Sequence, residues 1–238
     1  MAGGIRYVSA GPLSVLAIIL LIGLVLLLIP LLILGIIGAA FTRLGLSWVA
    51  ALALVLLMLA GSIVNIPLYR IRRDVIRATL LDPAGNELAA PFAAPPAWET
   101  TISINLGGGI IPLCIAAYMV YQAVVVTGTT LLTSLVLCAA IVMVISYVST
   151  HEIAGVGIRV PFIIPALTAL LAGLFLFGGT GLTAAATALA GGAVGTLAGG
   201  NLAHLNRVRD LEVPEVSIGG SGTFGAVFLC CILPALIA

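Results

Sequence analysis

Apolar runs long enough to cross a lipid bilayer recur along most of this 238-residue chain. A helix needs about 20 apolar residues to cross the roughly 30 Å hydrocarbon core of a membrane. Hydrophobic residues make up 62% of the chain and charged residues only 7%, whereas about 25% of residues are charged in an ordinary soluble domain. A soluble core of this size could not bury so much apolar surface. The sequence therefore predicts an all-α, polytopic helical membrane protein whose main partner is the lipid bilayer.

About seven transmembrane helices are expected within a single membrane domain. Pro30 falls inside the first of them, and its missing N–H predicts a kink or break there. That run is also too long for the apolar region of a cleaved signal peptide. Residues 70–101 form the cytoplasmic loop, in which the turn signal at 82–86 is compatible with a small hairpin. The expected spans are 12–38, 47–69, 107–126, 131–148, 162–177, 183–205 and 218–238.

The arginines orient these spans, because cytoplasmic loops carry an excess of basic residues. A cytoplasmic N-terminus leaves only Arg43 outside the cell and predicts an N-in, C-out topology. The net charge of +1 gives no indication of a nucleic-acid partner. The arginines then expected inside are Arg6, Arg70, Arg72, Arg73, Arg77, Arg159, Arg207 and Arg209.

Two stretches of the chain share a pattern of an apolar helix, an asparagine, a basic turn and a glycine-rich segment that leads into the next helix. Residues 60–74 resemble residues 198–210, and residues 102–108 resemble residues 216–220. Both units would descend to the cytoplasm and turn back into the membrane, which is the arrangement of a parallel repeat. We therefore predict a parallel 3+1+3 repeat, in which spans one to three and five to seven are the copies. The alternative is that glycine-rich helix starts recur by chance.

Polar side chains gather near the predicted cytoplasmic ends of the spans. Helix N-termini there would favour an anion, and Arg207 and Arg209 lie close in sequence. The residues thus predict a small polar pocket that faces the cytoplasm. The alternative is that they cap helices and satisfy buried backbone groups, and a structural hydrogen bond is the usual role of a lone histidine such as His204. The candidate ligand-binding residues are Asn65, Ser103, Asn105, Asn201, His204, Ser217, Ser221 and Thr223.

Gly191, Gly195 and Gly199 recur every fourth residue with Thr183 and Thr187, so they share one helix face. Such small-residue faces let transmembrane helices approach closely. This pattern predicts a helix-packing face, and the alternative is ordinary Ala/Gly-rich composition.

No catalytic, metal or cofactor site is predicted. All eight acidic residues fall in predicted connections, whereas proton relays and aspartyl proteolysis inside a membrane need carboxylates within the spans. The four cysteines lie in apolar runs without CxxC spacing, which is typical of small buried hydrophobes. The sequence therefore favours a protein that is not an enzyme.

Three ordered motifs resemble the family grouped as domain of unknown function 1614. They are GSIVNIP at 61–67, ISINLGGGIIP at 102–112 and VSIGGSGTF at 216–224. The resemblance implies an uncharacterised multi-pass protein of a prokaryotic plasma membrane, with no established activity. A weaker likeness, at residues 234–236 and the glycine-rich helix starts, is to intramembrane aspartyl proteases, whose two membrane aspartates this chain lacks.

Three functional hypotheses follow. The leading one is a small transporter-like or ligand-binding membrane protein with a cytoplasm-facing polar pocket. The second is a structural or accessory subunit, as a homo-oligomer or with a partner in a membrane complex. The third is a catalytically inactive relative of intramembrane aspartyl proteases, and an enzymatic role survives only if a partner chain supplies the missing carboxylates.

Overall fold

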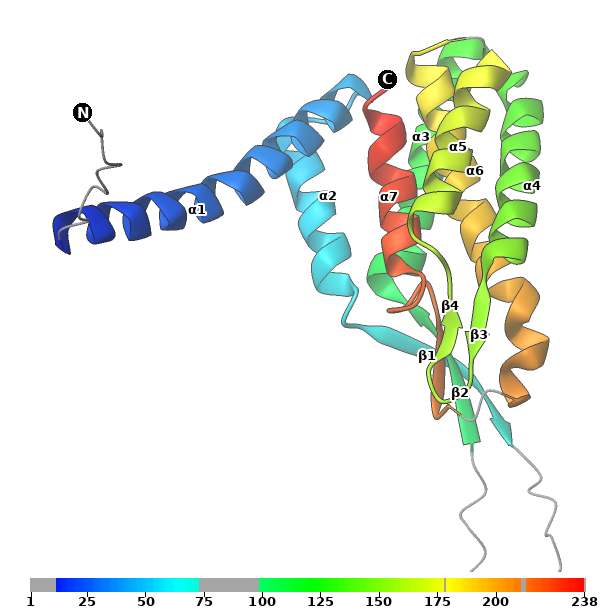
Figure 1. The fold of residues 1–238 in the computed structure, drawn as a ribbon. Helices are drawn as coiled ribbons and strands as arrows, with labels where there is room; N and C mark the ends of the chain where they lie inside the picture. Colours follow the sequence, from blue (N-terminus) through cyan, green and yellow to red (C-terminus); the bar gives the residue numbers. More distant parts are fainter. Residues whose placement is uncertain (1–11, 73–98, 178, 211–212, 238) are drawn as a thin grey trace, which may run out of the picture.

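The structure, a computed structural model, describes residues 12–72, 99–177, 179–210 and 213–237. Within these ranges the chain is mostly helical, with seven α-helices and two small sheets. Figure 1 shows that α2 to α7 form a bundle, that α1 leaves it at a steep angle, and that the strands gather at one end of it. The helices are α1 (Pro12–Arg43), α2 (Trp48–Gly61), α3 (Ile111–Thr127), α4 (Leu131–Ser149), α5 (Ile163–Phe177), α6 (Leu182–Gly200) and α7 (Phe224–Ala235).

Four helical stretches are long and apolar enough to cross a membrane. Their exposed surfaces are largely apolar, as expected for helices that face lipid. The helices α2, α5 and α7 are apolar but shorter. The structure thus supports a membrane protein. The four candidate spans are Ile18–Arg43, Leu106–Thr127, Leu131–Ser149 and Leu182–Val208.

Helix α6 is the centre of the bundle, and it contacts α3, α4, α5 and α7. It consists almost wholly of Ala, Gly, Thr and Leu, and most of its residues are buried. A helix that is buried on all sides must be apolar all round, and small side chains let four neighbours approach it.

The larger sheet has the strand order β1-β2-β5, with β1 at Asn65–Arg72, β2 at Glu99–Asn105 and β5 at Glu215–Ile218. Strands β1 and β2 are antiparallel, whereas β2 and β5 are parallel. Pro67 lies in β1, at an irregularity in the register, which suits an edge strand because Pro cannot donate to a neighbour. The smaller sheet is a hairpin of β3 (His151–Ile153) and β4 (Gly157–Arg159).

These strands correct the all-α prediction and one predicted span. The span expected over 47–69 is helical only to Gly61, because from Asn65 onward the backbone pairs with β2 instead of with itself. Asn65 and Pro67 mark this end of the span as polar and irregular in the sequence, but they do not distinguish a strand from a distorted last turn of the helix.

Other helix limits also differ from those expected. A π-helix at Leu106–Ile110 leads into α3, and a 3-10 helix at Leu202–Asp210 follows α6. Helix α7 begins at Phe224 instead of 218, because Ile218 ends β5 and a turn follows it. Helix α1 continues through Pro30 without the expected break, as apolar transmembrane helices tolerate proline. The hairpin expected around 82–86 lies outside the described residues.

Candidate functional site

The first residue of β1 and the last residue of β2 lie together at the strand end of the bundle. Asn65 begins β1, Asn105 ends β2, and the two are register partners. The side-chain amide of Asn105 donates to Asn65 Oδ1 at 2.9 Å, and Ser217 Oγ donates to the same oxygen at 2.7 Å. Asn65 Oδ1 therefore accepts two hydrogen bonds, which orients the side chain and leaves its NH2 group as the outward donor.

Asn105 is a structural residue, with 1% of its surface exposed. Its amide also donates to the Ser62 carbonyl at 2.7 Å, and its Oδ1 accepts from the Gly108 N–H at 2.8 Å. One side chain thus links the end of α2 to the start of the π-helix, where backbone groups would otherwise lack partners.

The glycines before α3 and α7 allow backbones to touch. A Cβ on Gly107 would meet the Met58 carbonyl oxygen, and one on Gly108 would meet the Gly219 carbonyl oxygen. Gly219 also has φ +74°, in the left-handed region that favours glycine. These positions bring α2, the π-helix and the turn after β5 into direct contact.

Asn201 and Thr223 fasten α6 to the turn before α7, and both are about 1% exposed. The amide of Asn201 donates to Thr223 Oγ1 at 3.0 Å, and the Gly219 N–H donates to Asn201 Oδ1 at 3.2 Å. Their polar atoms are used within the fold, which is the capping role that the sequence left open as an alternative.

Ser103 and Ser217 lie opposite each other on the parallel strands β2 and β5. Ser103 is buried, and its hydroxyl donates to Glu215 Oε1 at 2.5 Å. This short, charge-assisted bond holds the Glu215 carboxylate in one position.

A polar cavity of about 320 Å³ opens beside these residues, and we call it the sheet-end cavity. Three of the predicted site residues line it, namely Asn65, Ser217 and Ser221. Its charged side chains are Arg159 from β4 and Glu215 from β5. Its full lining is Ser62, Asn65, Val156, Gly157, Ile158, Arg159, Glu215, Val216, Ser217, Ser221 and Gly222.

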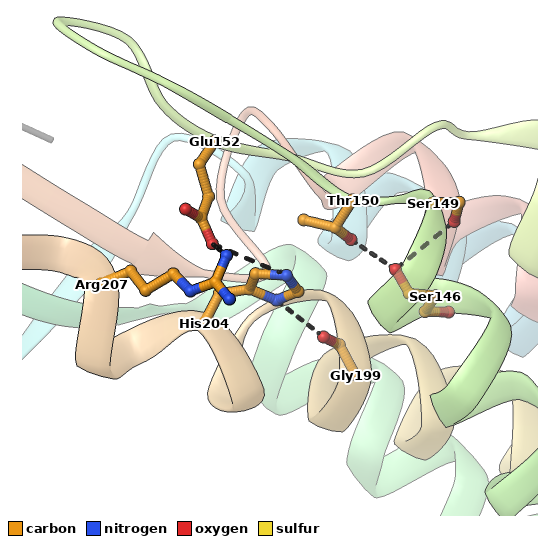
Figure 2. Close-up of polar contacts among 7 residues, drawn as sticks. All are labelled: Ser146, Ser149, Thr150, Glu152, Gly199, His204 and Arg207. Atoms are coloured by element: carbon orange, nitrogen blue, oxygen red, sulfur yellow. Dashed lines mark hydrogen bonds and ion pairs between the residues drawn. The ribbon is translucent and has the colours of Figure 1, made fainter.

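His204 belongs to a separate cluster (Figure 2). It is 3% exposed, its Nδ1 lies 3.0 Å from the Gly199 carbonyl oxygen, and its ring packs on Tyr147 with centroids 4.8 Å apart. Its Nε2 lies 3.8 Å from Glu152 Oε1, and Arg207 reaches the same oxygen at 3.3 Å. These contacts join the 3-10 helix to α6 and β3, so they favour a structural role for His204.

The structure therefore divides the predicted site residues. Asn65, Ser217 and Ser221 line the sheet-end cavity, Asn105 and Ser103 support its walls, and Asn201, Thr223 and His204 lie elsewhere. Sequence reasoning missed Arg159 and Glu215. The local sequence signal for Glu215 was its position directly before the motif at 216–224. Arg159 reaches the cavity through a hairpin that the sequence did not predict.

Arg207, which the sequence associated with the pocket, pairs with Glu152 instead. The side chain of Arg209 lies outside the described part of the structure. Within the described residues, no three His, Cys, Asp or Glu side chains gather as a metal site would require. The chemistry available at the sheet-end cavity is thus hydrogen bonding by hydroxyl and amide groups, together with one positive and one negative charge.

The predicted glycine face of α6 lies against α4. A Cβ on Gly191 would come within 2.7 Å of Cys138 Sγ, and one on Gly195 within 2.6 Å of the Ala139 carbonyl oxygen. A Cβ on Gly199 would meet the Met143 carbonyl oxygen. The face is therefore occupied within this chain.

Comparison with protein families gives one finding. The family described as "Protein of unknown function (DUF1614)" matches residues 59–237, which is most of the chain. The match begins in α2 and includes every residue that lines the sheet-end cavity. Neither the curated proteins nor the solved structures contain a match. The chain belongs to the DUF1614 family.

Proposed function

We propose that this DUF1614 protein is a non-enzymatic, small transporter-like or ligand-binding membrane protein, and that it binds a small polar ligand in the sheet-end cavity. The observation that carries this proposal is the cavity itself. Two opposite charges, three serines and an asparagine line about 320 Å³ at the end of an otherwise apolar bundle. Concave sites with a few convergent polar groups are the usual form of ligand sites.

We further propose that this end faces the cytoplasm and that all seven helices contribute to crossing the membrane. Arg70, Arg159 and Arg207 belong to elements at the strand end of the bundle, whereas Arg43 ends α1 at the opposite end (Figure 1). This distribution supports an N-in, C-out topology, because basic residues concentrate on the cytoplasmic side.

The lengths of the helices support a wet cavity within the membrane thickness. Helix α2 has 14 residues and α7 has 12, which corresponds to roughly 20 Å at about 1.5 Å per residue. That is shorter than a hydrocarbon core of about 30 Å. Non-helical backbone at membrane depth is tolerated where protein buries it or where it lines a water-filled cavity. The strands that follow α2 and precede α7 meet this condition at the sheet-end cavity.

The accessory-subunit hypothesis has less support. It was motivated by the glycine face of α6 and by the absence of acidic residues from the predicted spans, and α4 occupies that glycine face. A substitution such as Gly195→Leu would therefore disturb this chain's own packing before any assembly.

The test is native mass spectrometry of the full chain after gentle extraction from its own membrane. Wild type should carry a bound small molecule, and Ser221→Phe, which fills the cavity from an exposed position, should lose it. Asn206→Phe is the matched control, because Asn206 is also exposed at the strand end but does not line the cavity. Equal retention in all three proteins would refute the proposal.

A further inference from the structure

The sheet-end cavity lies at the level where three apolar helices meet polar structure. Ser62 directly follows α2, Arg159 lies shortly before α5, and Gly222 shortly before α7. In the proposed topology these helices lie in the hydrocarbon, so the cavity at their ends lies on the side of the lipid headgroups.

The two charges of the cavity do not neutralise each other. Arg159 forms no ion pair with any carboxylate in the described part of the chain, and its register partner across the hairpin is His151. Glu215 is held by the Ser103 hydroxyl. An unneutralised guanidinium and a fixed carboxylate in one cavity match a ligand that carries both an anionic and a cationic group.

The uncharged hydrogen-bonding groups of the cavity also suit a ligand of this kind. Ser221 contributes a hydroxyl, and Asn65 contributes the NH2 group that its two accepted hydrogen bonds leave free. Hydroxyl, amide and guanidinium donors together suit the several oxygens of a phosphate group. A carboxylate accepts the N–H donors of an ammonium group, which assigns the cationic part of the ligand to Glu215.

Apolar side chains border the polar cavity. Ile63 and Val64, which lie between the lining residues Ser62 and Asn65, are 86% and 46% exposed, and Val156 in the lining is 66% exposed. An apolar border next to a polar cavity on the headgroup side of the helices is suited to a ligand with acyl chains.

We propose that the sheet-end cavity binds an aminoalkyl phosphate, the zwitterionic group that forms the headgroup of phosphatidylethanolamine. This inference rests on the proposed function, which it makes specific. Arg159 and Ser221 contact the phosphate, Glu215 accepts from the primary ammonium, and the apolar border contacts the acyl chains. The same group could reach the cavity on a lipid or as a free solute, and the experiment separates these sources.

The test uses the full chain, delipidated in detergent and titrated separately with phosphatidylethanolamine, phosphatidylcholine, phosphatidylglycerol and soluble glycerophosphoethanolamine. Bound ligand is measured by native mass spectrometry. Phosphatidylethanolamine should bind at least about tenfold more tightly than the other two lipids, because choline has no N–H for Glu215 and glycerol has no positive charge. Displacement by glycerophosphoethanolamine would show that the headgroup alone suffices, whereas binding of the lipid only would identify the membrane as the source.

Charge variants test the assignment of each group. Glu215→Gln should abolish the preference for phosphatidylethanolamine, whereas Arg159→Gln should weaken the binding of all three lipids, because each of them carries the phosphate. Both residues are exposed, so the variants should unfold as wild type does. Arg207→Gln and Glu99→Gln are matched controls outside the cavity lining and should keep the preference. Equal binding of the three lipids by wild type, an unchanged preference in Glu215→Gln, or an unchanged affinity in Arg159→Gln would overturn the inference. The proposed function is tested separately by Ser221→Phe. If this variant loses the co-purified molecule, the proposed function stands even when the lipid preference is absent. If the variant keeps that molecule, the proposed function and the lipid assignment are both refuted.

Discussion

Ser103 and Ser217 are register partners on the parallel strands β2 and β5, and their hydroxyls hold two different residues of the same cavity. Ser103 donates to Glu215, and Ser217 donates to Asn65. The two glycine-rich motifs that the sequence suggested as copies therefore lie side by side and build one site. That the two motifs arose by duplication stays a prediction. The asparagines that the repeat equates differ in structure, because Asn65 begins a strand whereas Asn201 caps a helix.

Asn105→Leu should destabilise the protein instead of only weakening binding. The leucine would leave the Ser62 carbonyl, Asn65 Oδ1 and the Gly108 N–H without this partner. A buried polar group without its partner costs about 1–3 kcal/mol, so the unfolding free energy in mixed micelles should fall by at least that amount. Asn206→Leu, at an exposed position, should leave it unchanged.

Gly199→Ala should destabilise the contact between α4 and α6. The new methyl group would meet the backbone carbonyl of Met143, which cannot move as a side chain can, and overpacking typically costs about 1–3 kcal/mol. Gly35→Ala is the control, because a Cβ on Gly35 in α1 meets nothing within 4 Å. Thermal unfolding should show a lowered midpoint for the first variant alone. A midpoint equal to that of wild type in Gly199→Ala would contradict the packing described.

Gly219→Ala should cost more than Gly155→Ala, although both glycines have φ +74°. A positive φ of this size costs an L-residue about 1–2 kcal/mol. Only at Gly219 would the Cβ also meet a backbone carbonyl, that of Gly108, whereas the surroundings of Gly155 are open. Chemical denaturation of the two variants separates the conformational cost from the contact, and equal losses of stability would refute the close approach.

Single cysteines should reveal the proposed orientation. Asn206→Cys at the strand end should react with a membrane-impermeant maleimide only after the cells are opened, and Thr129→Cys between α3 and α4 should react in intact cells. Variants that also carry Cys114→Ser remove the exposed native thiol. Labelling of position 206 in intact cells would contradict the N-in topology.

Much of the helical framework could be predicted because apolar run length is local information. Helix α4 ends at Ser149 where the sequence predicts 148, and α5 begins at Ile163 where it predicts 162. The strands could not be predicted in this way. Asn65–Arg72 is a strand because it pairs with residues 27 to 40 positions away, and Glu99–Asn105 pairs in turn with residues more than 100 positions away.

Part of the candidate site could also be predicted, because some of its residues stand out locally in the sequence. Asn65, Ser217 and Ser221 belong to motifs that stand out in an apolar chain, so their polarity alone identified them. Arg159 comes from a hairpin with little sequence signal, and its place in the cavity depends on how β4 packs beside the turn before α7. Buried polar residues such as Asn201 have the same sequence appearance as ligand-binding ones, and only their hydrogen bonds distinguish the two roles.

The most direct test of the central claim, that the sheet-end cavity holds a ligand, is photo-crosslinking in intact cells. A benzophenone amino acid replaces Ser221 in one version of the full chain and Asn206 in another, and the adducts are identified by mass spectrometry after irradiation. The account predicts one defined small-molecule or lipid adduct at position 221 and none of that mass at position 206. The same adducts at both positions, or no adduct at 221, would contradict it.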